Sequence, residues 1–318
     1  MSGFDVDIVS PQFPCGAAWL ANALLELGLA LPELWGFDTA REWLDLGDGR
    51  WRYVAQDGPW AQTLAGPRPG REFQLAERPR LRFTHAFPWQ IERASRTLLF
   101  VRDPRDALYS EWRRHQRNEG LDPDIALPAF ARAGFWGGPV AYADLLWLHL
   151  ACWLHPDTLD LAPESVREAA ADRVLLLRFE DTKTDPAACL RRVLDWLGLS
   201  RSPTAIEAAV AASRVERLQR VEADRAMEAG SRVYNRAGLA FEWQRAWWPH
   251  WHVLLGPHWA PLLRTLGYPA LQALQGEPLR LDLPAALAWR GLPANAQAPW
   301  LARLAPACGL GSPAIATA

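Results

Sequence analysis

Lysine is nearly absent from this chain of 318 residues, because only Lys183 among its 34 basic residues is a lysine and the others are arginines. The acidic residues number 36, so the net charge at pH 7 is −2. A surface that binds nucleic acid needs a clear excess of positive charge. The charge balance therefore argues against a nucleic-acid partner.

Cysteine pairs and long apolar runs are also missing. The four cysteines, Cys15, Cys152, Cys189 and Cys308, show neither a CxxC pair nor the spacing of a metal site, so we expect unpaired thiols in a reducing compartment. The longest apolar stretch, residues 145–154, is too short to cross a bilayer. The first residues contain neither the basic nor the apolar region of a signal peptide. We therefore expect a cytoplasmic protein with no membrane span.

Short apolar runs alternate with helical segments along the chain. The predicted strands are residues 6–9, 80–84, 98–101 and 174–179. The predicted helices run from the end of a loop at 10–18 to about residue 27, and over residues 104–117, about 140–155, 186–197 and 203–212. Strands that alternate with helices predict parallel crossovers, so we expect an α/β fold whose central parallel sheet is flanked by helices.

Two regions depart from this alternation. Residues 32–79 are rich in Trp, Gly and Pro without a clean period, and we expect irregular structure with short helices there. Past residue 268 the composition shifts to Pro, Ala and Leu. The sequence thus predicts a main α/β domain over 1–268 and an extension with weak local structure over 269–318.

The segment at residues 98–110 joins a buried strand to a capped helix. Asp103 suits the N-cap, Pro104 the first helical position and Asp106 the position three residues after the cap. Arg102 therefore follows the carboxyl end of a strand and faces a helix N-terminus, where open α/β sheets bind ligands. A cation at this place predicts a ligand that carries a phosphate.

Four motifs carry a family resemblance. Residues 83–88 are FTHAFP, residues 102–110 are RDPRDALYS, residues 178–186 are RFEDTKTDP and residues 236–243 are RAGLAFEW. In this order they resemble the motifs of the cytosolic-type sulfotransferases, whose sulfuryl donor is 3′-phosphoadenosine 5′-phosphosulfate (PAPS). The resemblance spans about residues 6–268, and it implies the sulfotransferase fold, with a central sheet like that of P-loop NTPases.

The resemblance also implies roles for individual residues. His85 takes the place of the catalytic base, and its residue type suits proton acceptance near neutral pH; a structural histidine at a strand end is the alternative. Donor binding would fall to Arg102 and Ser110 at the 3′-phosphate and to Ser213 at the adenine. The late loop that closes over the nucleotide would supply Arg236, Ala237 and Gly238. The products would be the sulfated acceptor and adenosine 3′,5′-bisphosphate (PAP).

The first loop departs from the family pattern. The family pattern at this place is YPKSGTTW, whereas residues 10–19 are SPQFPCGAAW. Amides at a helix N-terminus hold a phosphate without side chains, so the expected 5′-phosphosulfate site comprises Cys15, Gly16, Ala17 and Ala18, with Trp19 stacking on adenine. The lysine position falls on Pro14, or on Gln12 if two residues are inserted after Pro11.

A replacement for this lysine is not evident. Lys183 belongs to a turn that we expect to be solvated and far from the chemistry. Arg82 lies on the opposite strand face from His85, because side chains alternate along a strand, and Phe83 occupies the place of the second family lysine. Arg236, Gln12 or the amides of the first loop remain as candidates to replace this lysine.

Two functions follow from these observations. The first is a PAPS-dependent sulfotransferase that acts on a hydroxyl of a small-molecule acceptor. The second is a sulfotransferase-like protein that binds the nucleotide without turnover. A P-loop kinase lacks its motif here. His250, His252 and His258 have no acidic or cysteine partner at ligand spacing, so we expect packing there and no metal.

Overall fold

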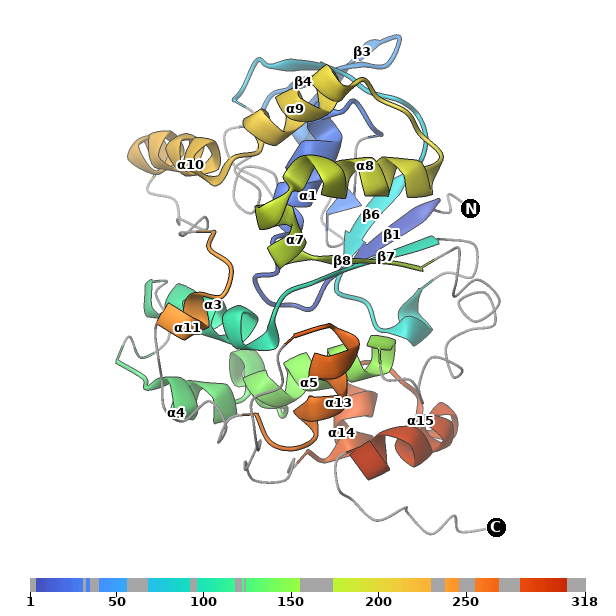
Figure 1. Cartoon of the computed structure of the whole chain (residues 1–318), viewed down its shortest axis with the longest axis vertical. Coiled ribbons are helices and arrows are strands. Elements are labelled where there is room, and N and C mark those ends of the chain that lie inside the picture. Colours follow the sequence, from blue (N-terminus) through green and yellow to red (C-terminus); the bar gives the residue numbers. More distant parts are fainter. Residues whose placement is uncertain are drawn as a thin grey trace.

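The structure is a computed structural model, and it describes residues 4–30, 33–34, 40–55, 68–91, 96–117, 122, 124–154, 174–229, 238–245, 255–268 and 281–307. A five-stranded sheet with the order β2-β6-β1-β7-β8 forms its centre (Figure 1). All pairings in this sheet are parallel. The strands are β1 (Val6–Val9), β2 (Glu33–Leu34), β6 (Leu81–Thr84), β7 (Arg96–Val101) and β8 (Val174–Arg178). The predicted α/β fold with a central parallel sheet is confirmed.

The sequence of the strands explains their place at the centre. All four residues of β1 are buried, and so are the last five of β7, as expected for a parallel sheet covered on both faces. In the register, Val9 of β1 pairs with Thr84 of β6 and with Leu99 of β7. The carboxyl ends of these strands therefore meet at one edge of the sheet, where the chain leaves each strand for a loop or a helix.

One group of helices covers the upper face of the sheet in Figure 1. Asp185 and Ser202 cap two of them by accepting hydrogen bonds from the amides of Ala188 at 2.8 Å and Ala205 at 3.2 Å, and each cap precedes a proline at the first helical position. These signals explain why two predicted helix ranges are confirmed to the residue. The group comprises α1 (Ala17–Glu26), α7 (Phe179–Thr184), α8 (Pro186–Leu197) and α9 (Pro203–Ala212), with α10 (Val215–Ala229) beyond them.

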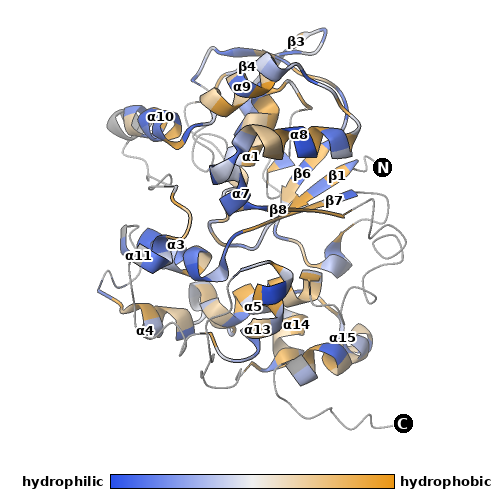
Figure 2. Cartoon of the chain, in the orientation of Figure 1, coloured by the Kyte–Doolittle hydropathy of each residue, from blue (hydrophilic) through white to orange (hydrophobic). Residues whose placement is uncertain are grey.

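A second group of helices lies below the sheet in Figure 1 and has its own hydrophobic core, around the fully buried Trp147 and Trp259. Figure 2 shows mostly apolar residues in α5 and mostly polar ones in α3. The group comprises α3 (Pro104–Arg117), α4 (Leu127–Arg132), α5 (Tyr142–Leu154), α13 (Trp259–Thr265), α14 (Leu283–Trp289) and α15 (Ala294–Ala307). The short elements are α11 (Glu242–Arg245) and the 3-10 turns η1 (Ala40–Glu42), η2 (Pro88–Gln90) and η3 (Phe135–Gly137). Within the part of the chain that the structure describes, no helix is long and apolar enough to cross a membrane.

The expectation of irregular structure over 32–79 is wrong for a large part of that region. It contains β2 and a separate antiparallel sheet, β3 (Trp43–Gly47), β4 (Arg50–Tyr53) and β5 (Glu72–Gln74). The hairpin between β3 and β4 turns at Asp48 and Gly49, both with positive φ. An Asp-Gly pair is a strong hairpin signal, which the lack of a clean hydrophobic period concealed.

The expectation of weak local structure after residue 268 is also wrong within the described residues. Asp282 caps α14 by accepting a hydrogen bond from the amide of Ala285 at 3.1 Å, and a proline follows the cap. Leu287 and Leu304 of α14 and α15 are fully buried in the same core as Trp147. The abundant alanine and leucine of this segment form packed helices, because the leucines recur on one face of each helix. The division of the chain at residue 268 stays a prediction.

Candidate functional site

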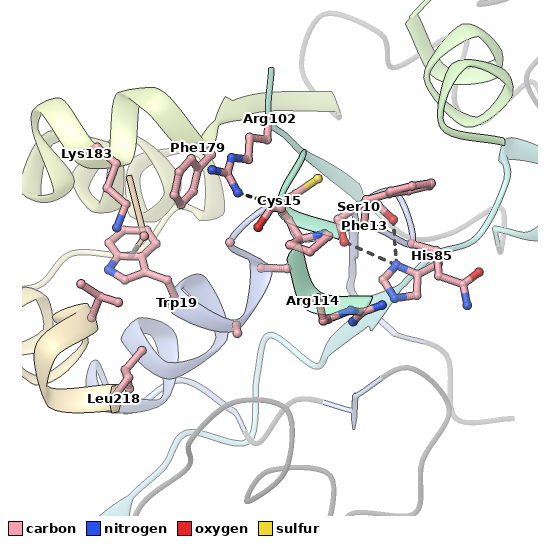
Figure 3. A pocket seen from close by; sticks show the side chains of 18 of the residues that line it. Ser10, Phe13, Cys15, Trp19, His85, Arg102, Arg114, Phe179, Lys183 and Leu218 are labelled. Atoms are coloured by element: carbon pink, nitrogen blue, oxygen red, sulfur yellow. Dashed lines mark hydrogen bonds between the residues drawn. The ribbon is translucent and has the colours of Figure 1, made fainter. Parts of the chain in front are cut away.

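A cavity of about 490 Å³ opens at the carboxyl ends of the central strands. Ser10 follows β1, His85 follows β6, Arg102 follows β7, and Phe179 follows β8, and all four line this cavity (Figure 3). Ligands bind at this edge of open α/β sheets, because loops and helix N-termini converge there. The structure thus brings Arg102 and His85, two of the residues predicted for the site, to one cavity.

The first loop forms one wall of the cavity. Cys15, Gly16, Ala17, Ala18 and Trp19 all line it, and α1 begins at Ala17 with no side-chain cap on its N-terminus. Gly16 has φ of 87°, and a Cβ there would lie 2.4 Å from the ring of Phe179, so both the backbone conformation and the space demand glycine. The uncapped amides at the start of α1 are therefore available to an anion.

The side chains of this loop bring no positive charge. Burial raises the pKa of the Cys15 thiol to about 12, so the thiol stays neutral at physiological pH. Gln12 and Pro14 both line the cavity, and both alignments of the missing lysine therefore stay open. Phe83 is fully buried in the core, and Arg82 points away and pairs with Asp7 at 2.6 Å, as predicted from the alternation of the strand.

Arg102 is held by backbone carbonyls at the end of β7. Its Nη1 donates to the carbonyl of Pro14 at 3.1 Å and its Nη2 to the carbonyl of Leu239 at 2.8 Å. The guanidinium packs over the ring of Phe179 at 4.5 Å, and Nη2 lies 3.6 Å from Asp106. Arg102 is thus fixed between the first loop and the segment before α11, and its positive charge is only partly balanced.

The start of α3 is fixed by a buried network. Asp103 accepts from the backbone amide of Arg105 at 3.0 Å, which confirms the predicted N-cap, and it pairs with the guanidinium of Arg105 at 2.6 Å. Trp243 donates its indole N–H to Asp103 and its backbone amide to Asp106. Ser110, two turns further along α3, lines the cavity with Arg102. Asp103 therefore binds Arg105, and the site retains Arg102 as a cation.

The RFEDTKTDP motif turns out to support the site as well as line it. Glu180 accepts from the amide of Asp103 at 2.9 Å and from the hydroxyl of Tyr268 at 2.6 Å. Lys183 is solvent-exposed, as predicted, but it lines the cavity, with Nζ 4.9 Å from the centre of the Phe179 ring. A single turn of α7 brings Lys183 over Phe179 at the cavity wall, and Figure 3 shows it at the end away from His85.

His85 is oriented by the strand next to its own. Its Nδ1 lies 2.9 Å from the carbonyl oxygen of Ser10, so that the proton of a neutral ring belongs on Nδ1. The pKa of His85 is lowered to about 4, mainly by burial and also by the charges of Arg290 and Arg114, while the hydrogen bond with the carbonyl of Ser10 opposes this shift. At neutral pH the ring is therefore uncharged, and Nε2 is the nitrogen that accepts a proton.

The segment after His85 is clamped by α5 and by the C-terminal helices. His149 and Trp153 both donate to the carbonyl of Ala86, at 3.2 and 3.1 Å. Trp89 and Gln90 both donate to the carbonyl of Arg290, at 3.2 and 2.9 Å. The end of α14 thus fixes the loop that carries the base.

The remaining predicted residues fall into two groups. Ser213 and Gly238 line the cavity, and Ser213 accepts a hydrogen bond from Asn22 of α1 at 2.8 Å. Arg236 and Ala237 lie outside the described residues, as do His250 and His252. His258 packs edge-on against Trp147 at 5.5 Å, and the described part of the chain contains no cluster suited to a metal ion.

Arg114 and Trp136 are among the residues of the cavity wall that the sequence analysis did not identify. Arg114 lies four residues after Ser110 and so shares its face of α3, a spacing from which the position was predictable once α3 was placed. Trp136 comes from η3, whose position at the cavity depends on tertiary packing. No local pattern signals it.

The sulfotransferase domain family model matches residues 67–249, more than half of the chain, and the chain therefore belongs to this family. The match includes His85, Arg102 and Lys183 and begins after the divergent first loop. No curated protein matches the chain.

Several solved structures are similar at low identity. A mouse sulfotransferase, SULT7A1, complexed with PAP, is 14% identical, with a TM-score of 0.49 over 84% of this chain and 86% of that one. Retinol dehydratase in complex with androsterone and the inactive cofactor PAP is 17% identical, with a TM-score of 0.48 over 76% of each chain. A sulfotransferase from Alicyclobacillus acidocaldarius is 15% identical, with a TM-score of 0.38 over 70% of this chain and 97% of that one.

Proposed function

We propose that the chain transfers the sulfuryl group of PAPS to a hydroxyl group of a small-molecule acceptor. One observation carries this proposal: a neutral histidine at the end of β6 and a buried arginine at the end of β7 line the same cavity. Transfer requires a group that accepts the proton of the hydroxyl and a cation that holds the phosphates of the donor. His85 and Arg102 meet these two requirements.

The residues around Arg102 fit a phosphorylated nucleotide. Nε of Arg102 is buried and has no hydrogen-bond partner among the described residues, and the N-terminus of α1 carries no side-chain cap. Both features leave donors for anionic oxygens. We assign the 3′-phosphate to Arg102 and Ser110, and the 5′-phosphosulfate to the amides of residues 15–18.

The end of the cavity away from His85 suits the adenosine. Trp19 offers a flat ring for the adenine, and Ser213 and Gly238 also line the cavity. Figure 3 shows Lys183 directed toward Trp19, so we add Lys183 to the residues that contact the nucleotide. The contributions of Arg236 and Ala237 stay predictions from the family pattern.

His85 performs the proton transfer. PAPS, when bound, supplies an activated sulfuryl group. Nε2 of His85 takes the proton of the acceptor hydroxyl as the bond between acceptor oxygen and sulfur forms. The electron pair of the broken sulfur–oxygen bond stays on the phosphate, where the amides of the first loop stabilise the negative charge. The proton thus moves to His85, and the negative charge develops on the phosphate on the other side of the sulfur.

A second candidate function follows from the first loop. Pro14, Gln12 and the buried Phe83 supply no cation at the two lysine positions of the family pattern. A protein that binds the nucleotide without turnover needs no such cation. Tight binding of PAP without any transfer would favour this candidate.

Transfer of radiolabel tests the proposal. The protein is incubated with sulfur-35 PAPS and a panel of phenols and alcohols, and the organic products are separated from PAPS and inorganic sulfate. We expect label in an organic product, and none with Arg102→Ala at donor concentrations that serve the parent. Absence of labelled product from every acceptor, with PAP bound, would overturn the proposal in favour of the non-catalytic candidate.

The state of the cysteines supports a cytoplasmic setting for this reaction. Cys15, Cys152 and Cys189 are buried free thiols. Unpaired thiols are usual in reducing compartments. We keep the cytoplasmic location as part of the proposal.

A further inference from the structure

The end of the cavity next to His85 contains a cation and an exposed aromatic ring that the proposed transfer does not use. Arg114 of α3 and Trp136 of η3 both line the cavity, and the guanidinium carbon of Arg114 lies 6.0 Å from the centre of the Trp136 ring. Figure 3 shows Arg114 beside the imidazole of His85, while Arg102 and Lys183 lie toward the other end. These two residues therefore face the acceptor side of the base.

Arg114 is anchored from behind and directed into the cavity. Its Nη2 donates to Glu111 at 2.5 Å, and the carboxylate of Glu111 is fully buried. The side chain of Arg114 keeps 30% of its surface exposed. A guanidinium carries five N–H donors in a rigid plane, so the pair with Glu111 fixes the group and leaves further donors for an anionic ligand.

Trp136 is presented to the cavity by a short loop that an isolated bridge closes. The residue is 56% exposed although tryptophan usually buries its large apolar surface, and its φ is 49°, a left-handed conformation that is rare for a bulky residue. An isolated bridge between Gly134 and Ala141 closes the loop, and Tyr142 accepts from the amide of Trp136 at 3.3 Å. An exposed flat ring held in a strained backbone suits stacking on a planar ligand.

The geometry of the transfer decides which reactant Arg114 serves. In an in-line displacement the entering and leaving oxygens lie on opposite sides of the transferred atom. His85 must contact the entering oxygen, so a cation beside His85 lies on the acceptor side of the sulfur. A cation there lies away from the negative charge that develops on the leaving phosphate, and close to a negative charge on the acceptor.

We propose that the acceptor is a hydroxylated aromatic compound that carries a carboxylate, with Arg114 binding the carboxylate and Trp136 stacking on the ring. This inference rests on the proposed sulfuryl transfer. A guanidinium matches a carboxylate in shape and charge. A neutral phenol of the same shape would leave the N–H groups of Arg114 facing the cavity without an anionic partner.

Paired acceptors test this inference. Rates of transfer are compared for 4-hydroxybenzoate and its methyl ester, and for 4-hydroxyphenylacetate and its methyl ester, which differ in charge but share ring and hydroxyl. We expect kcat/KM to favour each acid by roughly 10- to 100-fold, the usual effect of a charge-assisted contact. Arg114→Gln should remove this preference by lowering kcat/KM for the acids much more than for the esters, whereas Arg114→Lys should keep part of it.

Control variants separate this role from a structural one. Arg113→Gln removes the same charge one position earlier, from a side chain that bonds to Gln116 and is not part of the cavity wall, so the preference should survive. Trp136→Ala should weaken the binding of acid and ester alike. Melting curves with PAP show whether Arg114→Gln still folds and binds the nucleotide.

Each outcome decides the inference. Equal kcat/KM for acid and ester in the parent would overturn it, and so would an equal loss for both in Arg114→Gln, which would mean that Arg114 acts on the transferred group or the fold. If no acceptor is sulfated, the proposed function fails, and equilibrium binding to the PAP-loaded protein then tests the subsite alone. Tenfold tighter binding of the acid that Arg114→Gln abolishes would support the subsite, and equal binding would overturn it.

Discussion

The guanidinium of Arg102 donates a hydrogen bond to the carbonyl oxygen of Leu239 across 2.8 Å, which joins the end of β7 to the segment before α11. A second hydrogen bond, to the carbonyl of Pro14, joins the same side chain to the first loop. The cation that we assign to the 3′-phosphate therefore also connects two walls of the donor site.

Replacement of Arg102 by Ala should abolish the discrimination between nucleotides. PAP should raise the melting temperature of the parent by several degrees at about 100 times its Kd, because a ligand that binds only the folded state stabilises it. 5′-AMP, which lacks the 3′-phosphate, should raise it much less. In Arg102→Ala the two nucleotides should act equally, and thermal shift assays measure the difference.

Arg191→Ala provides the matched control, because this arginine is exposed on α8 and is not part of the cavity wall. It should keep the preference for PAP. Equal stabilisation of the parent by PAP and 5′-AMP would contradict the assignment of Arg102.

Replacement of His85 should separate chemistry from binding. His85→Ala should retain the thermal shift with PAP but transfer sulfuryl groups about 100- to 10,000-fold more slowly, the usual contribution of a general base. Rates measured at saturating donor isolate this effect. Turnover at the parental rate would instead assign His85 to the structure of the strand end.

The pH dependence of transfer should follow the depressed pKa of His85. Burial lowers this pKa from 6.5 to about 4, and a base acts only when deprotonated, so activity should rise with pH through the pKa and then level off. We expect a constant kcat/KM from about pH 5 to 7.5 with an aliphatic acceptor, which does not titrate there. A half-maximal rate near pH 6.5 would show that the base is solvated in the working enzyme.

Bound nucleotide should protect Lys183 from chemical modification. Lys183 is the one lysine of the chain and lines the cavity beside Phe179. Reductive methylation followed by mass spectrometry should therefore report on this position without interference from other lysines. We expect PAP to slow the modification at least about fivefold by excluding the reagent. The same rate with and without PAP would remove Lys183 from the donor site.

A lysine restored to the first loop should reveal how the natural enzyme manages without it. Pro14→Lys and Gln12→Lys each place an ammonium group on the cavity wall, one for each alignment, and a cation near the leaving oxygen is worth about 3 kcal/mol in barrier height. We expect a faster rate in the variant whose alignment is correct. A decrease in both variants would mean that the loop amides already balance the charge.

The sequence predicted those elements whose signals are local. The strand at 98–101, the helix at 104–117 and its cap at Asp103 are specified by adjacent residues, and so are the proline-initiated helices α8 and α9. The separate three-stranded sheet was missed because its strands are short and lack a clean hydrophobic period, and because β5 pairs with a strand about 20 residues earlier in the chain. The C-terminal helices were missed because composition alone suggested a tail.

The candidate site shows the same division. Arg102 was predicted because it follows the end of a strand, and His85 and Ser110 were predicted because they stand in motifs that resemble those of the family. Lys183, Arg114 and Trp136 were not, because their access to the cavity depends on how α7, α3 and η3 pack around it. Lys183 lies within the RFEDTKTDP motif, but its place at the cavity wall was not predicted, and the four motifs do not include Arg114 or Trp136.

A single-turnover measurement tests the central claim most directly. Enzyme in excess over sulfur-35 PAPS is mixed with acceptor, and organic sulfate, inorganic sulfate and PAP are quantified over time. The account predicts that organic sulfate and PAP form in equal amounts at one rate, and that His85→Ala slows both at least about 100-fold. Release of inorganic sulfate alone, or an unchanged donor that remains bound, would contradict a sulfotransferase mechanism for this chain.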